Sequence, residues 1–578
     1  MSKKKNKYHV PRIVPKELQQ LIAGAKPEVI QIADFKIWCL YNPEILFANS
    51  MIIEGKDGVI LIDTGISRTA GEYIKGKLEE LTTKPLTTII YTHHHYDHVN
   101  GTNAIVEREQ VENGEIKILA AHNFIKEYTA ENVTAGPIMA WRASYGYGNF
   151  MDQEEQDNYL IGGMMAKPCF GTGVFIPPNT LLKKEQDLEI HGVKMHIFHT
   201  GGEAATEIAI YLPELKVLFC ADEVYPSNPN LHSLRGTKPR DANNWINAID
   251  KMRQFDIDYL VGSHGKPVEG KEKIDEILLY YRDIIQYQHD QAIRYINQGY
   301  TYKDLAEKIP ELPEYLKYPP YSSDFYGHTK HNVPEYFVGY VSWFAGDPVD
   351  LQPTPSKEKA AKFIELMGGP EKVLVEAEKL FSEGKPQLAA ELATLLIAKS
   401  TKNMNARKLK AACFRKMGYQ QINSWWRAWY LTSALELEMK LDIQGLTKKR
   451  QELIRSWEMV SALSLEQIYS RFRYSVDPLK AKNKNMTIGM IFTDTEEQFS
   501  LELRHSVLIH SDAIPENADV VLTMTRDLLN RIMTRECSFL NSIAKKEMTI
   551  KGKKTKLLEF FKCLDLSFKP IFLTLGLK

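Results

Sequence analysis

The stretch T-I-I-Y-T-H-H-H-Y-D-H-V-N-G, residues 88–101, places four histidines and one aspartate within six positions, directly after a short apolar run. The apolar run is rich in β-branched residues, which predicts a buried strand. In a loop that leaves a strand, His93 and His95 can direct two imidazoles at one point, and Asp97 and His98 can serve a second point nearby. Imidazole and carboxylate ligands together suit Zn²⁺ and neighbouring divalent ions, so the stretch predicts a metal site.

Two plainer interpretations of these histidines are a solvated loop and the N-terminal cap of a helix. A single histidine would favour either of them. The pattern Thr-His-x-His-x-Asp-His immediately after an apolar strand favours metal binding instead. His94 alternates with the proposed ligands and is expected to face away from the metal.

Further candidate ligands follow where later strands are expected to end. These residues are His199 and Glu203 in HTGGEAATE, Asp222 with Glu223 beside it in CADE, and His264 in GSHG. Taken singly, Asp222 could cap a helix and His264 could be a loop histidine with ordinary hydrogen bonds. Taken together with the first motif, they favour metal ligation. Ligands at the carboxyl ends of strands are typical of α/β folds.

The whole chain has 578 residues, so two or three domains are expected. Lys plus Arg and Asp plus Glu are both 73, which gives no argument for nucleic acid as a partner. No apolar run approaches the ~20 residues of a membrane-spanning helix, and the basic N-terminus lacks the apolar part of a signal peptide. A cytoplasmic protein is expected. The six cysteines are far apart in sequence and are interpreted as thiols.

Three blocks succeed one another along the chain. Residues 1–350 alternate strand and helix patterns, including a hairpin around the turn sequence Lys56-Asp57-Gly58. After a proline-bearing linker, residues 351–465 have apolar positions at helical spacing, broken at Gly384-Lys385-Pro386 into helix pairs that resemble tetratricopeptide hairpins. Residues 466–578 alternate polar and apolar positions first, which predicts a half-buried antiparallel sheet followed by helices.

The histidine motif, with a downstream Glu, Asp and His, resembles the metallo-β-lactamase fold. Asp63-Thr64-Gly65 matches the aspartate that ends a strand in that fold and supports the metal loop from behind. This resemblance implies an α/β fold, an αββα sandwich. Because that fold carries many hydrolases, it leaves the substrate open.

Segments along nearly the whole chain are similar to the zinc-dependent alkyl sulfatases, which act on dodecyl sulfate and similar esters. The segments are GGEAATEIAIYLPELKVLFCADE, NLHSLRG, RDANNWINAIDKM, YGHTKHNVPEYFVGYVSWFAGDP and WWRAWYLTSALEL. The resemblance implies a catalytic domain, an α-helical dimerisation domain and an α+β C-terminal domain similar to sterol carrier proteins. It also implies two Zn²⁺ ions per chain, an alkyl sulfate substrate and a homodimer.

Residue by residue, the resemblance implies two zinc sites. The implied ligands of one ion are His93, His95 and Glu203, and those of the other are Asp97, His98 and His264. Asp222 is implied to bridge the two ions. Asn230 and Arg235 match the polar pair that holds the sulfate, and together with Asp97 they are the expected catalytic residues. The fork of donors on an arginine fits a pair of sulfate oxygens, although without the resemblance Arg235 could equally be a surface residue.

Two further positions match the substrate pocket, namely Tyr147 and His331. Asn230 stands where some family members that act on secondary esters have His, which favours primary esters here. The sequence departs from the family beside three of the expected ligands: Gly201-Gly202 precedes Glu203, Glu223-Val224-Tyr225-Pro226 follows Asp222, and Gly265-Lys266-Pro267 follows His264. These differences concern the pocket walls and therefore the substrate.

The expected activity is hydrolysis of a sulfate monoester by a zinc-activated water. An alternative keeps the two metals and changes the substrate to a phosphoester, lactone or thioester. A third hypothesis is a non-catalytic lipid-binding or scaffold protein that uses only the helical and C-terminal regions; the full set of metal ligands argues against it. The C-terminal domain is interpreted either as a module that binds apolar chains or as a structural cap.

Overall fold

The structure is a computed structural model that describes residues 8–151, 173, 175–461, 463–567 and 569–575. The chain forms two compact units. The first contains the segments Met1–Tyr128, Ile138–Leu441 and Phe572–Leu577, and the second contains Thr129–Pro137 and Asp442–Ile571. The domain boundaries at residues 350 and 465 stay a prediction.

The first sheet of unit 1 has its seven strands in chain order. They are β1 (Glu28–Gln31), β2 (Ile37–Tyr41), β3 (Ser50–Glu54), β4 (Val59–Ile62), β5 (Leu86–Ile90), β6 (Lys117–Ala121) and β7 (Thr180–Leu182). Strands β1 to β4 pair antiparallel, and β4 to β7 pair parallel. The predicted hairpin at Lys56-Asp57-Gly58 is confirmed, because it joins β3 to β4. The predicted strand that leads into the histidines is β5.

The second sheet of unit 1 has six strands, in the order β13-β12-β11-β10-β9-β8. They are β8 (Glu185–Ile190), β9 (Val193–His199), β10 (Ile208–Leu212), β11 (Val217–Ala221), β12 (Tyr259–Gly262) and β13 (Val268–Glu269). Strands β11 and β12 pair parallel, and their neighbours pair antiparallel. The parallel pairs β4–β5 and β11–β12 put the loops that carry the predicted ligands at strand carboxyl ends.

The two sheets pack face to face through an apolar core. Met51 and Ile53 of β3 join a cluster with Ile208 and Ile210 of β10. Ile52, which alternates with them, packs on the opposite face of its sheet. Because β3 and β4 are covered on both faces, their residues form the continuous apolar runs seen in the sequence.

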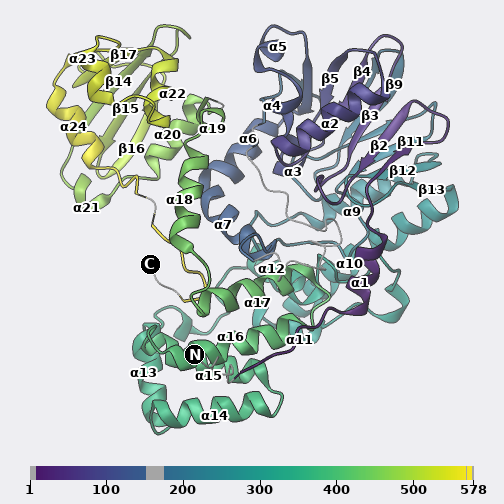
Figure 1. The fold of residues 1–578 in the computed structure, drawn as a ribbon, viewed down its shortest axis with the longest axis vertical. Helices are drawn as coiled ribbons and strands as arrows, with labels where there is room; N and C mark the ends of the chain where they lie inside the picture. The colour runs from purple at the N-terminus through teal and green to yellow at the C-terminus, as the bar shows by residue number, and fades with distance from the viewer. Residues whose placement is uncertain (1–7, 152–172, 174, 462, 568, 576–578) are drawn as a thin grey trace, which may run out of the picture. The chain divides into compact units, whose positions relative to one another are not determined.

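Helices cover both outer faces of this sandwich (Figure 1). Helix α2 (Arg68–Leu81) packs Ile74 against the first sheet. Helices α9 (Ala242–Met252) and α10 (Lys271–Ile296) pack against the second sheet, with Trp245 fully buried between them. Unit 1 therefore contains the expected four-layer αββα sandwich.

The remaining helices of unit 1 lie at its ends or between its strands. Those before residue 147 are α1 (Lys16–Gly24), α3 (Tyr96–Val99), α4 (Thr102–Ile105), α5 (Arg108–Glu112), α6 (Phe124–Thr129) and α7 (Gly136–Gly146). The π-helical turn Ala130–Thr134, between the last two in sequence, belongs to unit 2. Those after α10 are α11 (Tyr302–Lys308), α12 (Thr329–Tyr340), α13 (Ser356–Leu366), α14 (Pro370–Ser382), α15 (Pro386–Lys399), α16 (Met404–Gly418) and α17 (Ser424–Leu437), with 3₁₀ turns at Glu314–Leu316 and Pro348–Asp350. The predicted helix break at residues 384–386 is confirmed.

A buried carboxylate ties the far end of the chain back into unit 1. Glu436 on α17 is 1% exposed and accepts hydrogen bonds from the backbone N–H groups of Leu573, Thr574 and Leu575, at 3.2, 3.0 and 2.8 Å. The hydroxyl of Tyr145 donates to the same carboxylate. Unit 1 is thus completed by residues that follow unit 2 in the sequence.

Unit 2 is an α+β structure around a five-stranded sheet. Its strands are β14 (Met486–Phe492), β15 (Gln498–Arg504), β16 (Val507–Ser511), β17 (Val520–Met524) and β18 (Thr549–Gly552), in the order β16-β15-β14-β17-β18. Its helices are α18 (Ile443–Ile454), α19 (Trp457–Ser461), α20 (Leu465–Arg473), α21 (Pro478–Ala481), α22 (Arg526–Thr534), α23 (Phe539–Ala544) and α24 (Lys554–Lys562). The antiparallel sheet predicted from residues 486–511 is confirmed in β14, β15 and β16. The next strand, β17, pairs parallel to β14, because the segment after β16 returns the chain to the other side of β14.

Two expectations about the whole chain concern membranes and thiols. Among the described residues, no helix has both the length and the apolar character that crossing a membrane requires. The five described cysteines are free, as expected, and Cys169 lies outside the described residues.

The close approach of α2 to α4 generates a stability prediction. A Cβ on Gly71 would lie 2.2 Å from the carbonyl oxygen of Gly101, whereas a Cβ on Gly76 of the same helix has no heavy atom within 4 Å. We expect Gly71→Ala to lower the free energy of unfolding by about 1–3 kcal/mol through overpacking. Gly76→Ala, the matched control, should raise it by about 0.5–1 kcal/mol. Thermal unfolding of both variants checks this order, and a Gly71→Ala variant at least as stable as wild type contradicts it.

Candidate metal centre

The structure brings all seven predicted metal ligands together. They form two groups, His93, His95, Glu203 and Asp222, and Asp97, His98, Asp222 and His264, in each of which the ligand atoms lie within 4.8 Å of one another. The residues come from the loop after β5, the turn between β9 and β10, and the ends of β11 and β12. Strand ends that are remote in sequence therefore meet at one edge of the sandwich.

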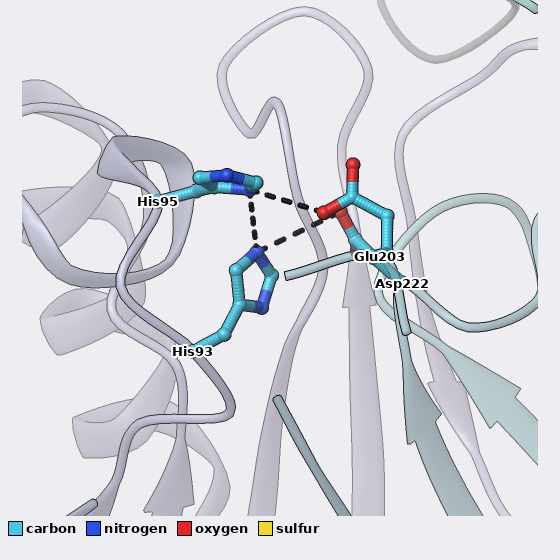
Figure 2. A group of neighbouring side chains, drawn as sticks. All are labelled: His93, His95, Glu203 and Asp222. Atoms are coloured by element: carbon cyan, nitrogen blue, oxygen red, sulfur yellow. Dashed lines mark hydrogen bonds and ion pairs between the residues drawn. The ribbon is translucent and has the colours of Figure 1, made fainter. Parts of the chain in front are cut away.

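In the first group, two imidazoles and two carboxylates face a common point (Figure 2). His93 Nε2 lies 2.9 Å from His95 Nδ1 and 3.9 Å from Asp222 Oδ2. His95 Nδ1 lies 3.3 Å from Glu203 Oε2. Ligands that share a tetrahedral metal at about 2.0–2.1 Å are separated by about 3.3 Å, so these spacings fit one ion.

In the second group, Asp222 appears again. Its Oδ2 lies 3.2 Å from His264 Nε2 and 3.6 Å from His98 Nε2. Asp97 Oδ2 lies 3.4 Å from His98 Nε2 and 3.6 Å from His264 Nε2. Asp222 therefore belongs to both groups, and its carboxylate faces both.

Hydrogen bonds on the far side of the rings fix which nitrogen faces each group. His98 Nδ1 lies 2.7 Å from the carboxylate of Asp63, and His264 Nδ1 lies 3.0 Å from the carbonyl oxygen of Phe47. Each acceptor favours the tautomer with a proton on Nδ1, which leaves the Nε2 lone pair for a metal.

Asp63 organises the histidine loop from beneath. It is fully buried and accepts hydrogen bonds from the backbone N–H and the hydroxyl of Thr92, at 2.9 and 2.7 Å. Its backbone has a φ of 59°, and Ala221, directly before Asp222, has a φ of 50°. Such conformations are uncommon for residues other than glycine, and they turn the chain sharply where β4 and β11 end.

The donor set fits a bound cation. Among the described residues, buried His98 Nε2 and Asp222 Oδ1 make no hydrogen bond. Burial raises the pKa of Glu203 to about 8, although the charges of Arg240 and Arg235 oppose this shift. Buried carboxylates and orphaned nitrogens are costly unless a positive partner satisfies them, and imidazole with carboxylate is a donor set that suits divalent metals.

Two more buried carboxyl groups brace the ligand loops. Glu207 accepts hydrogen bonds from the backbone N–H groups of Asp222 and Ala204, at 2.7 and 3.2 Å. Glu223 accepts one from the N–H of Gly202 at 3.0 Å. Each carboxyl thus holds the loop that carries a ligand on the other strand. Burial raises the pKa of Glu223 to about 7. Burial also raises the pKa of Glu207, and the negative charge of Glu223 raises it further.

Asn230, expected to bind sulfate, lies in a tightly held segment. Its backbone N–H donates to the hydroxyl of Tyr225 at 2.6 Å, and its Oδ1 lies 3.2 Å from His331 Nε2. Because Trp426 donates to His331 Nδ1 at 2.9 Å, the proton of His331 lies on Nε2 and points to Asn230. The Nδ2 of Asn230 is buried and has no hydrogen-bond partner among the described residues.

Arg235 and Tyr147, the other expected pocket residues, lie beside this segment and beside an apolar wall. The charge of Arg235 acts on both Glu203 and Tyr147. The ring of Tyr147 lies 5.4 Å from that of Phe47 and 5.0 Å from that of Trp425, measured between centroids. Phe47 lies 5.6 Å from His264. Phe47, Tyr147, Trp425 and Tyr326, which packs on Trp425, are called the aromatic wall below.

His199 and His94 lie outside these two ligand groups. His199 Nε2 lies 2.9 Å from the carbonyl oxygen of Ala205 and belongs to neither ligand group. His94 Nδ1 lies 2.8 Å from the hydroxyl of Thr206, and His94 belongs to neither of these two ligand groups. Sequence reasoning missed Arg240 and Glu207. Their charged side chains occur in sequence contexts typical of a protein surface, and only the tertiary structure buries them.

The four-layer sandwich and the histidine–carboxylate cluster at its edge define a protein of the metallo-β-lactamase superfamily, and residues 44–264 match that superfamily. Residues 301–440 match the alkyl sulfatase dimerisation family, and residues 454–573 match the alkyl sulfatase C-terminal family. The chain is 36% identical over 528 residues to a linear primary-alkylsulfatase of Pseudomonas sp., which covers 90% of this chain and all of the relative. The chain therefore belongs to the alkyl sulfatase family.

Two further relatives agree with this assignment. An (R)-specific secondary-alkylsulfatase of Pseudomonas sp. is 30% identical over 91% of this chain and 79% of its own. The solved structure of the stereoselective inverting sec-alkylsulfatase Pisa1 from Pseudomonas sp. has a TM-score of 0.88 and 28% identity. The superposition covers 98% of this chain and 91% of that one. The fold expected from the sequence is thus confirmed over nearly the whole chain.

The environment of His232, next to the Asn230 segment, generates a pH prediction. Burial and then the guanidinium groups of Arg240, Arg142 and Arg235 lower the pKa of His232 to about 4. An unfolded histidine has a pKa of about 6.5, so between these values the unfolded chain binds a proton that the folded chain does not. Stability should therefore fall as the pH falls from about 6.5 to 4, by up to about 3 kcal/mol from this residue.

We expect His232→Asn to flatten this dependence. Urea unfolding of wild type and variant at pH 7, 5.5 and 4.5 measures the difference between them. His9→Asn, which alters an exposed histidine, is the control and should leave the dependence unchanged. An equal loss of stability in wild type and His232→Asn between pH 7 and 4.5 would contradict the prediction.

Proposed function

We propose that this protein hydrolyses sulfate esters of primary alkyl alcohols, such as dodecyl sulfate. The products are the alcohol and inorganic sulfate. The observation that carries the proposal is the position of Asp222 in both ligand groups, together with the buried amide nitrogen of Asn230, which has no hydrogen-bond partner among the described residues. The relatives are alkylsulfatases, which supports the same reaction class.

We further propose that the resident metal is zinc, with two ions per chain. His93, His95 and Glu203 would hold one ion, and Asp97, His98 and His264 would hold the other, with Asp222 between them. When bound, such a pair supplies a water of lowered pKa and positive charge beside the ester. Asp97 would act as a ligand in contact with the reacting water.

The residues of the Asn230 segment bind and orient the sulfate. Asn230 donates from Nδ2, because its Oδ1 is occupied by His331. Burial holds the pKa of His331 well below its ordinary value, so the ring stays neutral and retains that hydrogen bond. Arg235 supplies a permanent charge and parallel N–H donors for sulfate oxygens, and the two donors stabilise the sulfate as it leaves.

The aromatic wall provides an apolar surface for the alkyl tail. An alkyl chain offers no polar handle, so apolar contact is the means by which a protein recognises it. Tyr147 connects the aromatic wall to the sulfate-binding residues, since it packs on Phe47 and lies close enough to Arg235 for the charge of that arginine to act on its hydroxyl. Asn230, in place of the His of some enzymes for secondary esters, supports the preference for primary esters.

The proposed assembly follows the family. A homodimer formed through the helices of residues 351–465 is proposed, since residues 301–440 match the dimerisation family. The catalytic domain is proposed to span residues 1–350 and the C-terminal domain residues 466–578. A cytoplasmic location is proposed as well.

The second candidate function is hydrolysis of a phosphoester, lactone or thioester at the same two metals. The buried donor of Asn230 and the guanidinium of Arg235 discriminate, because a lactone offers no anionic oxygens to them. A non-catalytic scaffold does not explain why the ligand atoms of seven residues converge.

The experiment that tests the function is sulfate release from dodecyl sulfate by the full-length protein, with and without a chelator. Metal content is determined on the same sample. We expect about two zinc ions per chain, release that stops on chelation, and recovery when zinc is added back. Two metals without sulfate release would move the substrate to another ester, and a protein that binds no metal would overturn the proposed site.

A substitution of Arg235 tests the sulfate-binding role. Arg235→Ala should lower kcat/KM for dodecyl sulfate at least about tenfold, which corresponds to about 1.4 kcal/mol of lost transition-state stabilisation. The zinc content should stay the same, since Arg235 is not a ligand. Arg253→Ala, which removes an arginine paired with Asp250 on the surface, is the control and should have wild-type kinetics. Wild-type kcat/KM in Arg235→Ala would show that this residue does not bind the sulfate.

A further inference from the structure

Arg240 is a buried arginine between the two parts of the site. We propose that it is a positioning residue that ties Glu203, a metal-binding carboxylate, to the sulfate-binding segment at Asn230. This inference rests on the proposed function and adds a residue for which the sequence suggested no role.

The contacts of Arg240 reach both parts at once. Its Nη2 forms an ion pair with Glu203 Oε1, and its Nη1 donates to the backbone carbonyl of Asn230. The arginine side chain and the Glu203 side chain are each only 4% exposed. A single rigid, planar group therefore spans a ligand of the metal centre and the backbone that carries the sulfate donor.

On the Glu203 side, the two carboxylate oxygens have different partners. Oε1 is held by the guanidinium, while Oε2 faces His95 at 3.3 Å and makes no hydrogen bond among the described residues. Rotation of the carboxylate would break the pair with Arg240. The guanidinium thus keeps one oxygen directed at the metal position, as partners of metal ligands commonly do.

On the Asn230 side, Arg240 completes a set of restraints. The N–H of Asn230 is held by Tyr225 and its Oδ1 by His331, and its carbonyl is held by Arg240. With both backbone polar groups and one side-chain atom fixed, the direction of the Nδ2 donor is fixed as well. A donor that is aligned before the substrate arrives needs no reorganisation during the reaction.

The backbone of Arg240 is itself anchored. It directly precedes Asp241, which caps α9 by accepting hydrogen bonds from the N–H groups of Asn243 and Asn244 at 3.0 and 3.2 Å. Helix α9 packs on the second sheet through fully buried Trp245, whose Nε1 donates to the carbonyl of Glu223. Arg240 therefore projects from a rigid element, which a positioning role requires.

The alternative is that Arg240 only neutralises the buried charge of Glu203. Lysine separates the two roles, because an ammonium group preserves the charge but is a compact point that cannot reproduce the two-armed contact. If charge balance alone matters, Arg240→Lys keeps the metal and the sulfate affinities. If positioning matters, both affinities fall although the charge is unchanged.

The experiment compares Arg240→Lys with Arg407→Lys in the full-length protein. Arg407 is the matched control, since it is equally buried and donates to the backbone carbonyl of Leu437, away from the metal-binding residues. Three quantities are measured: zinc affinity by titration against a competing chelator, the inhibition constant of inorganic sulfate, and the melting temperature. Arg240→Gln is measured in the same way, so that the test stands if the lysine variant does not fold.

We expect Arg240→Lys to weaken the binding of the ion held by Glu203 by about 10- to 100-fold, the range found for partners of metal ligands. The inhibition constant of sulfate should rise at least threefold, while Arg407→Lys keeps wild-type values for both. The proposal that Arg240 positions both Glu203 and the Asn230 segment would be overturned if folded Arg240→Lys kept both wild-type affinities, or if only one of the two affinities changed.

Failure of the proposed function would be visible separately. Wild-type protein that binds zinc but releases no sulfate from dodecyl sulfate would refute the sulfatase assignment. The zinc titration and direct calorimetric binding of inorganic sulfate still test Arg240 in that case, since neither depends on turnover.

Discussion

The shared carboxylate of Asp222 is the interaction on which the rest of the centre depends. It stands in both ligand groups, and the imidazoles of His93, His98 and His264 approach it from two different sheets. A buried cluster of acids and imidazoles is unfavourable without positive charge at its middle. We therefore expect a bound cation to stabilise this edge of the sandwich.

The fold holds the loops of this cluster in place through sharp turns and through hydrogen bonds from buried carboxylates to the backbone. Left-handed residues turn β4 and β11 sharply at their ends, and Asp63 holds the histidine loop through Thr92. Glu207 and Glu223 cross-brace the loops of Glu203 and Asp222. None of these groups is expected to touch the substrate. Their common effect is to fix the ligand atoms before an ion arrives, so that less ordering entropy opposes binding.

Much of this organisation could be predicted from the sequence, because the strongest signals are local. The β-branched runs gave β3, β4 and β5, and the spacing of His93, His95, Asp97 and His98 indicated two ligand groups. Strand-end positions also made Glu203, Asp222 and His264 candidate ligands. Assigning each of them to one of the two groups required a family resemblance, since nothing in one chain shows which distant strand ends meet.

Other features depend on tertiary structure and escaped prediction for that reason. Arg240 and Glu207 are charged residues whose burial no periodicity announces, and their roles lie in contacts with loops far along the chain. The parallel pairing of β17 with β14 escaped because alternation predicts a strand but not its neighbour or its direction. Local patterns thus located the candidate metal ligands, and long-range contacts determine what holds them in place.

The link from Glu436 to residues 573–575 bears on the order in which the protein is made. Three backbone amides near the far end of the chain satisfy a carboxylate that is buried in unit 1. A ribosome synthesises all of residues 442–571 before those amides exist. During translation, therefore, the Glu436 carboxylate has the Tyr145 hydroxyl as a donor before residues 573–575 add their three backbone N–H groups, although the segments that form the sheets of unit 1 have already been synthesised.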